Sequence, residues 1–558
     1  MRSPFRKFAG LFLATSLALA ACGSDDSESS SEPQATVEQN ESPDGTDAPA
    51  DDPADDPADS TAAESTLPAV PEGAECGVLV AAVAEDFDIL DPQIAAGETP
   101  ATWLSLIYET IVGVDQFANP TEGLATDWTI SDDGLSYTFN LRDGVSFTNG
   151  EPFDSSIVKW NLERIINPET AASSQSLLSV IESIDTPDPL TVVLNLSEPN
   201  APLISALSQQ GRAGMMHPDA VDDTNTLVTH LGTGPFSYVS YATGDRLVLD
   251  ANADYWDGAP LLQGIEVRLI PDGTSRLNAL DTGDIDFGWA VPAEDATTLA
   301  EDGNFVLQEN VQNRGNFFSI NVTKAPFDNP KLREAMNLAV SRSDIAAAGW
   351  NGFAVETLQP YNEDSFWYMD KELRKDASLE AARAIIKENG FEGTPVTVVQ
   401  WEALGSDNEA QIVASAWNDI GLDVTIEKVG GADLISRSEE LDFDVIYLYI
   451  SLITDPTRAY NYLLESTATR NGISGGVQSA EMDELLSAAT ISSDPDERKD
   501  LYNKILDLNY DLGAMFYTVR PIQFVGIGAD VTGFQMGVYN VKYVGDGSIT
   551  KTCVPVDG

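Results

Sequence analysis

The stretch LATDWTISDDGLSYTFNLRDGVSFTNGEPFDSSIVKWNLER, residues 124–164, is the part of the chain from which the fold can first be predicted. Two short runs of alternating apolar and polar residues flank a turn at residues 132–134 (DDG), a pattern typical of a β-hairpin. After Asp154 the apolar residues change to helical spacing, and Asp is a residue type that caps helix N-termini. Pro168 then stops the helix. We expect a scaffold here, because no residue is placed for chemistry.

The same stretch resembles the signature segment of the large extracytoplasmic solute-binding proteins that serve oligopeptide, dipeptide and nickel importers of the ABC type. The matching residues are Trp128, Ser131, Gly134, Tyr137, Phe139, Leu141, Arg142, Gly144, Val145, Phe147, Gly150 and Phe153. Shorter segments agree with the same family: LDP at 90–92, YE at 108–109, GTGPF at 232–236, NADYWDGAP at 252–260, GDID at 283–286, APFDN at 325–329 and DP at 455–456.

The resemblance implies an α/β, two-lobed periplasmic-binding-protein-like fold of type II, in the large cluster that carries an extra subdomain in lobe I. We expect lobe I at residues 76–318 with the inserted subdomain at about 116–229. Lobe II is expected at 319–519, and residues 520–558 return to lobe I.

Local patterns add elements to this outline. A helix is expected at 378–389 with Ser378 as its cap, and a strand, a helix and a strand follow at 396–401, 408–420 and 424–429. This alternation predicts a parallel sheet. Further helices are expected at 331–345, 480–490 and 495–509, a helix in the YE segment carries Leu104, Ile107 and Tyr108 at core spacing, and strands return in the tail at 522–544.

The N-terminus has the features of an export signal. Arg2, Arg6 and Lys7 precede an apolar run at 8–20 that is too short to span a membrane, and LAAC at 19–22 has the form of a lipobox. Its resemblance to bacterial lipoproteins implies that Cys22 is acylated and anchors the protein to the membrane; an ordinary secretory signal is the alternative. Residues 23–75 are rich in Asp, Glu, Ser, Pro and Ala and are expected to form a disordered acidic linker.

The chain is strongly acidic. It has 558 residues and a net charge of −60, and only 16 of its 90 acidic residues lie in the linker. Such a surface argues against nucleic acid as a partner, because nucleic-acid binding needs basic patches. Once Cys22 is assigned to the lipobox, Cys76 and Cys553 remain. In an oxidising compartment they predict a disulfide, with two free buried thiols as the alternative.

Little in the sequence supports catalysis. The two histidines, His217 and His230, have no partner spacing, and no HExxH, GxSxG or Cys/His cluster is present. We therefore expect no enzyme activity, no cofactor and no metal site. The sequence does not exclude a catalytic pair of carboxylates of the glycosidase type, because acidic residues are too numerous for one pair to be singled out.

The resemblance implies a cleft between the lobes, and such clefts are lined by aromatic side chains and a few polar groups. Strand ends and loops then give the expected ligand-binding residues, although core packing is the alternative for each aromatic. These residues are Ala96, Gly97, Glu98, Trp103, Trp289, Phe317, Trp401, Tyr447, Tyr449 and Ser451.

The chain departs from peptide-binding relatives at one position. Those relatives carry an Asp shortly before the DP that pairs with the α-ammonium of the peptide, whereas Leu452 or Ile453 stands there in this chain. Either another acid, such as Glu402 or Asp455, substitutes for it, or the ligand has no such ammonium, because an unpaired buried charge is costly.

The resulting hypothesis is a monomeric substrate-binding lipoprotein of an ABC importer. It captures a peptide or a similar small organic solute and delivers it to the membrane permease. The alternatives are a receptor for a non-peptide solute such as an oligosaccharide and, from another class, a secreted hydrolase.

Overall fold

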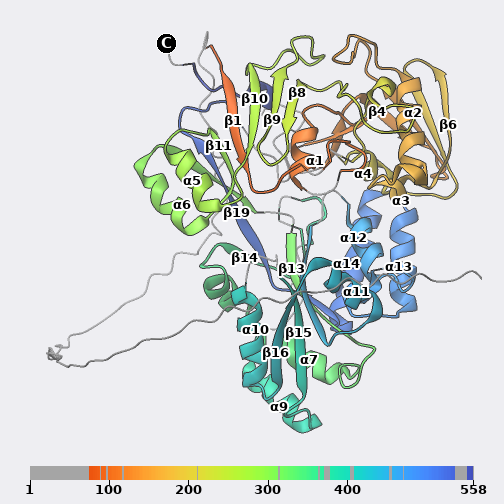
Figure 1. Ribbon diagram of the computed structural model, residues 1–558. Coiled ribbons are helices and arrows are strands. Elements are labelled where there is room, and N and C mark those ends of the chain that lie inside the picture. The colour runs from red at the N-terminus through yellow and green to blue at the C-terminus, as the bar shows by residue number, and fades with distance from the viewer. Residues whose placement is uncertain are drawn as a thin grey trace, which may run out of the picture. The chain divides into compact units, whose positions relative to one another are not determined.

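The structure is a computed structural model that describes residues 75–87, 89–95, 98–115, 119–209, 212–311, 314–361, 363, 365–369, 377–402, 407–451, 455–468, 470–534 and 549–556 (Figure 1). The expected signal peptide, Cys22, the acidic linker up to residue 74 and the predicted tail strands beyond residue 534 lie outside these ranges.

Three larger sheets organise the described chain. The β1 sheet has eight strands in the order β12-β19-β11-β1-β10-β9-β8, with β14 paired to β19. Its strands are β1 (Val78–Val83), β8 (Phe236–Ala242), β9 (Arg246–Ala251), β10 (Gly264–Leu269), β11 (Phe287–Val291), β12 (Phe305–Val311), β14 (Ala354–Glu356) and β19 (Val519–Gly528). Figure 1 shows β19, near the end of the chain, in the same sheet as β1, near its start.

The other two larger sheets are the β5 sheet, of four strands in the order β4-β5-β7-β6, and the β13 sheet, of five strands in the order β16-β15-β17-β13-β18. The β5 sheet contains β4 (Ala125–Ile130), β5 (Ser136–Leu141), β6 (Ile181–Asp188) and β7 (Thr191–Leu196), and a separate pair is formed by β2 (Val112–Val114) and β3 (Pro120–Glu122). The β13 sheet contains β13 (Arg314–Ile320), β15 (Pro395–Trp401), β16 (Asp423–Val429), β17 (Val445–Ser451) and β18 (Met515–Tyr517).

Helices surround these sheets. The α-helices are α1 (Glu98–Leu104), α2 (Ser155–Ile166), α3 (Gln175–Leu178), α4 (Leu203–Leu207), α5 (Gly273–Asp281), α6 (Ala293–Leu299), α7 (Pro330–Leu338), α8 (Arg342–Asp344), α9 (Leu379–Asn389), α10 (Asp407–Asp419), α11 (Gly431–Glu440), α12 (Pro456–Leu464), α13 (Ala480–Ile491) and α14 (Pro495–Leu512). Shorter turns are η1 (Pro168–Thr170), η2 (Pro218–Ala220), η3 (Ala300–Asp302), the π-helical η4 (Ile345–Gly349), η5 (Asn471–Ser474) and η6 (Ile549–Lys551).

The hairpin and helix expected from residues 124–164 are confirmed. Strands β4 and β5 pair antiparallel around the turn at 132–134. The carboxylate of Asp154 accepts hydrogen bonds from the backbone N–H groups of Ser156 and Ile157, and α2 ends at Ile166, before Pro168. Buried residues of the β5 sheet and α2 share one apolar core.

The parallel arrangement expected in the second half is also confirmed. Strand β15 runs parallel to both β16 and β17, while β13 runs antiparallel to β17. Ser378 caps α9 by accepting from the N–H of Ala381, and Gly390 ends the helix in the left-handed conformation. Side chains of α7, α9 and α10 pack with Phe318, Val398 and Tyr447 of this sheet in a single core.

Two helix predictions are wrong in their extent. The helix expected at 331–345 is interrupted, since α7 ends at Leu338 and α8 begins at Arg342. Ser341 adopts an extended backbone there, and its hydroxyl accepts from the N–H of Asp344, so it starts a new helix instead of continuing the old one. Helix α1 ends at Leu104, and Ile107 and Tyr108 are buried in the turn that follows.

Three of the short sequence motifs meet at one buried carboxylate. Glu109 accepts hydrogen bonds from the Thr233 hydroxyl (2.9 Å), the Tyr255 hydroxyl (2.8 Å) and the Trp256 indole N–H (3.0 Å). The glycines of GTGPF allow this approach, because a Cβ on Gly232 would lie 1.9 Å from the carbonyl oxygen of Ile107. These three motifs therefore stabilise the fold, by holding distant segments together around Glu109.

The β1 and β13 sheets are joined by two neighbouring chain crossings. Two residues separate β12 from β13, and Thr518 alone separates β18 from β19. The N–H of Thr518 donates to the carbonyl of Asn316 over 2.9 Å, so the two crossings are held together.

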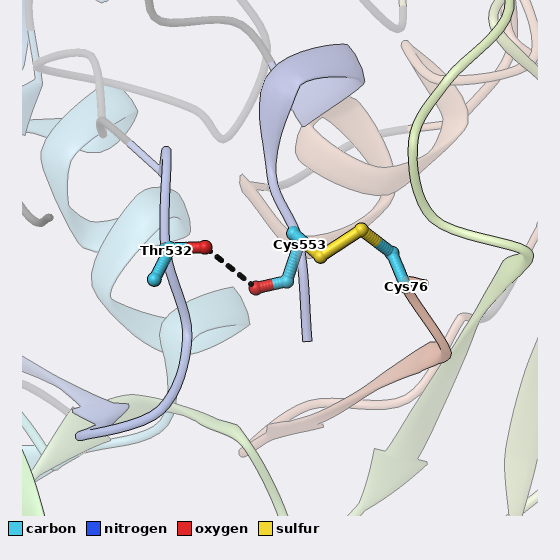
Figure 2. Close-up of a disulfide and its surroundings, with 3 residues drawn as sticks. All are labelled: Cys76, Thr532 and Cys553. Atoms are coloured by element: carbon cyan, nitrogen blue, oxygen red, sulfur yellow. Dashed lines mark hydrogen bonds between the residues drawn. A yellow bond between two sulfur atoms is a disulfide. The ribbon is translucent and has the colours of Figure 1, made fainter. Parts of the chain in front are cut away.

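The predicted disulfide is present in the structure. Cys76 and Cys553 are bonded, with their Cα atoms 5.1 Å apart and 477 positions apart in sequence. Figure 2 shows the Thr532 hydroxyl beside this bridge, donating to the carbonyl oxygen of Cys553 over 3.4 Å. Backbone hydrogen bonds in both directions between Thr532 and Cys553 add to the attachment.

Candidate functional site

Half of the residues expected to bind ligand lie on two strands of the β13 sheet and at the end of a third. Phe317 belongs to β13, Trp401 ends β15, and Tyr447, Tyr449 and Ser451 belong to β17. Because β15 and β17 are parallel, their carboxyl ends share one edge of the sheet. Ligands in open α/β sheets bind at this kind of edge.

Burial divides the four aromatic residues of this group. Trp401 and Tyr449 are half-buried, and their rings stack with centroids 6.0 Å apart and planes inclined by 29°. Phe317 and Tyr447 are fully buried, and Tyr447 stacks on Phe318 at 4.5 Å. Trp401 and Tyr449 therefore offer surface to a ligand at the sheet edge, whereas Phe317 and Tyr447 support that edge from the core. Ser451 is the last residue of β17.

The expected residues of the first half lie elsewhere. Ala96 and Gly97 are outside the described residues, and Glu98 is the first residue of α1. Trp103 and Trp289 are buried in the core of the β1 sheet, where both contact the ring of Phe287 at centroid distances of 6.0 and 6.1 Å. The described contacts place these two tryptophans in a group separate from Trp401 and Tyr449.

Arg314 joins the aromatic pair at the sheet edge and was missed by the sequence analysis. It is the first residue of β13 and lies opposite Ser451 in the strand register. Its guanidinium carbon lies 3.6 Å from the centroid of the Tyr449 ring. Arg314, Tyr449 and Trp401 therefore form a layered cluster, which we call the edge cluster. In the sequence nothing separates Arg314 from any other arginine, because its position depends on strand register.

A buried carboxylate lies on the same face of the sheet. Glu409, in the first turn of α10, accepts from the amide of Asn316 (2.9 Å), the indole of Trp350 (2.8 Å) and the hydroxyl of Thr518. Burial, reinforced by the charge of Glu409, raises the pKa of the Tyr447 hydroxyl well above its ordinary value, so this hydroxyl stays protonated. Glu409 thus ties α10 to both chain crossings.

The two acids considered as substitutes for the missing Asp differ in availability. Asp455 is buried, forms a two-pronged ion pair with Arg498 (2.7 and 2.8 Å) and caps α12 through the N–H of Thr457. It is therefore committed to structure. Glu402 is exposed and follows Trp401 directly. Leu452 and Ile453 lie outside the described residues.

Within the part of the chain that the structure describes, no group of three or more His, Cys, Asp or Glu side chains is arranged to hold a metal ion. Among the same residues, no helix has both the length and the apolar composition needed to cross a membrane.

Comparison with known proteins gives a consistent set of relatives. Residues 119–472 match the bacterial extracellular solute-binding proteins, family 5. The glutathione-binding protein GsiB of Salmonella paratyphi A is 33% identical over 293 residues, which is 52% of this chain and 57% of that protein, so this alignment spans little more than half of the relative. GsiB of Salmonella typhimurium is 28% identical over 459 residues, covering 80% of this chain and 89% of that protein.

A solved structure extends the likeness to the whole fold. The ABC transporter-associated periplasmic binding protein DppA from Helicobacter pylori, in complex with the peptide STSA, is 25% identical to this chain with a TM-score of 0.72. The match covers 86% of this chain and 99% of DppA.

Proposed function

Because this chain belongs to family 5 of the bacterial extracellular solute-binding proteins, whose members bind solutes and are not enzymes, we propose that it is the substrate-binding lipoprotein of an ABC importer. It captures a peptide or a similar small organic solute between two lobes and delivers it to the permease in the membrane. The glutathione-binding and peptide-bound relatives support a peptide-like solute.

The observation that carries this proposal is the edge cluster. Trp401 and Tyr449 stack at the carboxyl ends of parallel strands, both remain half-buried, and the guanidinium of Arg314 lies over the Tyr449 ring. Partly exposed aromatic rings with one charged group are typical of small-molecule sites. The cluster also adjoins the crossing that leads into β13, and a lobe that moves about such crossings would open and close over a ligand.

The proposed lobes follow the sheets. Lobe I comprises 76–318 and 520–558 and holds most of the β1 sheet, and the inserted subdomain at about 116–229 holds the β5 sheet. Lobe II, 319–519, holds most of the β13 sheet. Strand β12 of the β1 sheet ends at Val311, and Thr518 joins β18 to β19, so the chain passes between the two sheets close to both proposed boundaries. Ala96, Gly97, Glu98, Trp103 and Trp289 are proposed as the lobe I contribution to the site.

A thermal-shift screen with the purified mature protein tests solute binding. The screen contains reduced glutathione, Ser-Thr-Ser-Ala, other tri- and tetrapeptides, and neutral oligosaccharides. A ligand at 100 times its Kd stabilises the folded state by about 2.7 kcal/mol, which raises the unfolding midpoint measurably. Failure of every solute to raise it would contradict the proposal, and steady consumption of a solute would favour a hydrolase.

A non-peptide solute is the second candidate, and one observation favours it. Neither Leu452 nor Ile453 carries charge, and the neighbouring Asp455 already pairs with Arg498. A shift with oligosaccharides and none with peptides would select this alternative.

Lipid anchoring at Cys22 is tested separately. Expression in a bacterial host with lipoprotein processing is expected to place the protein in the membrane fraction, and Cys22→Ser is expected to release it to the soluble extracytoplasmic fraction. An unchanged distribution would contradict the anchor.

A further inference from the structure

Arg314 differs from other arginines of this acidic chain in its partners. Arg164 and Arg498, which are buried, pair with Asp91 and Asp455 at 2.6 and 2.7 Å. Arg342, also buried, donates to the carbonyl oxygens of Thr357 and Tyr517. Arg314 has no ion pair with any described residue, and its Nε is buried without a hydrogen-bond partner.

The aromatic stack holds Arg314 in place without satisfying its donors. A guanidinium over an aromatic face gains about 0.5–2 kcal/mol from the cation–π attraction. The ring contact supplies no hydrogen-bond acceptor to the Nε–H, which is buried without a partner. This donor therefore lacks an acceptor within the protein. A buried donor without an acceptor costs about 1–3 kcal/mol, which an acceptor on the ligand would recover.

The carboxylate on this face of the sheet does not supply that acceptor. Side chains alternate along a strand, so Asn316 points to the same face as Arg314, and the amide of Asn316 donates to Glu409. Glu409 also accepts from Trp350 and Thr518. These bonds fix it as part of the scaffold.

We propose that Arg314 binds a carboxylate of the captured solute through two parallel N–H···O hydrogen bonds, with the Tyr449 ring, itself stacked on Trp401, holding the guanidinium. This inference rests on the proposed function and deepens it, because it identifies the solute as an anion that bears a carboxylate. A planar guanidinium fork matches a carboxylate better than a neutral acceptor. The carboxylate can be the C-terminus of a peptide or a carboxylate elsewhere in the solute, such as that of a γ-glutamyl group.

The test compares wild-type protein with Arg314→Gln and Arg314→Lys by calorimetric titration. The probe is the tightest binder among glutathione, Ser-Thr-Ser-Ala and the other peptides of the screen, together with the same molecule amidated at each carboxylate in turn. Arg314→Gln is expected to weaken binding of the free acid about 10- to 100-fold, and Arg314→Lys less, because a charge-assisted bidentate pair is lost or reduced to one contact.

Amidating the carboxylate that Arg314 holds is expected to weaken wild-type binding by a similar factor and to have little further effect on Arg314→Gln. Which amide loses affinity identifies the carboxylate. Arg383→Gln is the matched control: Arg383 is exposed and donates to the carbonyl of Asp419, at the other end of α10 from the edge cluster, so its removal should leave binding unchanged.

Two kinds of failure are distinguishable. A wild-type protein that binds free acid and amides equally, that prefers a neutral sugar, or whose affinity survives Arg314→Gln overturns the assignment of Arg314 but leaves solute binding intact. A wild-type protein that binds nothing overturns the proposed function and this inference together. The wild-type comparison of acid and amide decides the matter even if Arg314→Gln does not fold.

Discussion

Glu109 shows how much of a long chain can depend on one side chain. Its carboxylate collects donors from Thr233, Tyr255 and Trp256, which are more than 120 positions away in sequence. We expect Glu109→Gln to lower the free energy of unfolding by about 1–3 kcal/mol, because an amide offers one acceptor oxygen where the carboxylate offers two. Urea denaturation measures this. Glu182→Gln, at an exposed carboxylate of β6, is the control, and equal effects of the two changes would contradict the prediction.

His230 provides a pH-dependent prediction at the same scale. Burial lowers the pKa of His230 to about 4, against the opposing charge of Asp91. The unfolded chain, with a His pKa near 6.5, therefore binds a proton between pH 6.5 and 4 that the folded chain does not, and stability falls as pH falls through this window. Because the ring is partly exposed, which weakens the effect, we expect a loss of about 1 kcal/mol between pH 6.5 and 5.

The measurement is the urea midpoint of wild type and His230→Gln at pH 6.5 and at pH 5. Gln retains an acceptor for the Tyr108 hydroxyl, which lies 2.8 Å from Nδ1 of His230. The variant should be less sensitive to this change in pH. If the two proteins lose stability equally, another group is responsible.

At the scale of elements, helix α2 depends on Asp154, the N-cap residue that precedes it. The carboxylate of Asp154 accepts from the backbone N–H groups of Ser156 and Ile157 in the first turn, where N–H groups lack the usual partner one turn earlier. We expect Asp154→Ala to reduce stability by about 1 kcal/mol and Asp154→Asn to restore most of it, as measured by thermal unfolding. A variant with Ala that is as stable as wild type would show that the buried face of α2 alone determines the helix.

Sequence patterns predicted an element correctly where that element depends only on residues close to it in sequence. The 132–134 turn, the Asp154 cap and the Ser378 to Gly390 helix each need only neighbours in sequence. The break before α8 was missed, because Ser341 can sit inside a helix or cap one, and only its backbone in the fold decides between them.

The candidate site was predictable only in part, for a related reason. Trp401 could be found because it ends a strand of a parallel pattern, and Tyr449 because it lies in the next strand. Whether a ring faces the core or the edge depends on packing by distant elements, which separates Tyr449 from the buried Tyr447. Arg314 joins them only through the pairing of β13 with β17. The sequence of either strand alone does not predict which strand it pairs with or in which register.

At the scale of the whole molecule, the Cys76–Cys553 disulfide closes nearly the entire folded chain into a loop. A cross-link between residues 477 positions apart removes a large entropy from the unfolded state. We expect Cys76→Ser, Cys553→Ser and the double variant each to lose about 2–5 kcal/mol of stability, and nearly equally, because either single change breaks the same bond. Thermal unfolding with and without reductant measures this, and mass analysis confirms the bond.

The disulfide lies beside β1, whereas the edge cluster is built on the β13 sheet. We therefore expect removal of the disulfide to lower thermal stability without changing solute affinity. Below its lowered midpoint, the double variant should bind solute with wild-type affinity, and reductant should shift the midpoint of wild type but not of the variant. Loss of binding at temperatures where the variant is fully folded would show that the attachment of the C-terminal segment also shapes the site. An unchanged midpoint would mean that the hydrogen bonds between Thr532 and Cys553 suffice to hold the C-terminal segment.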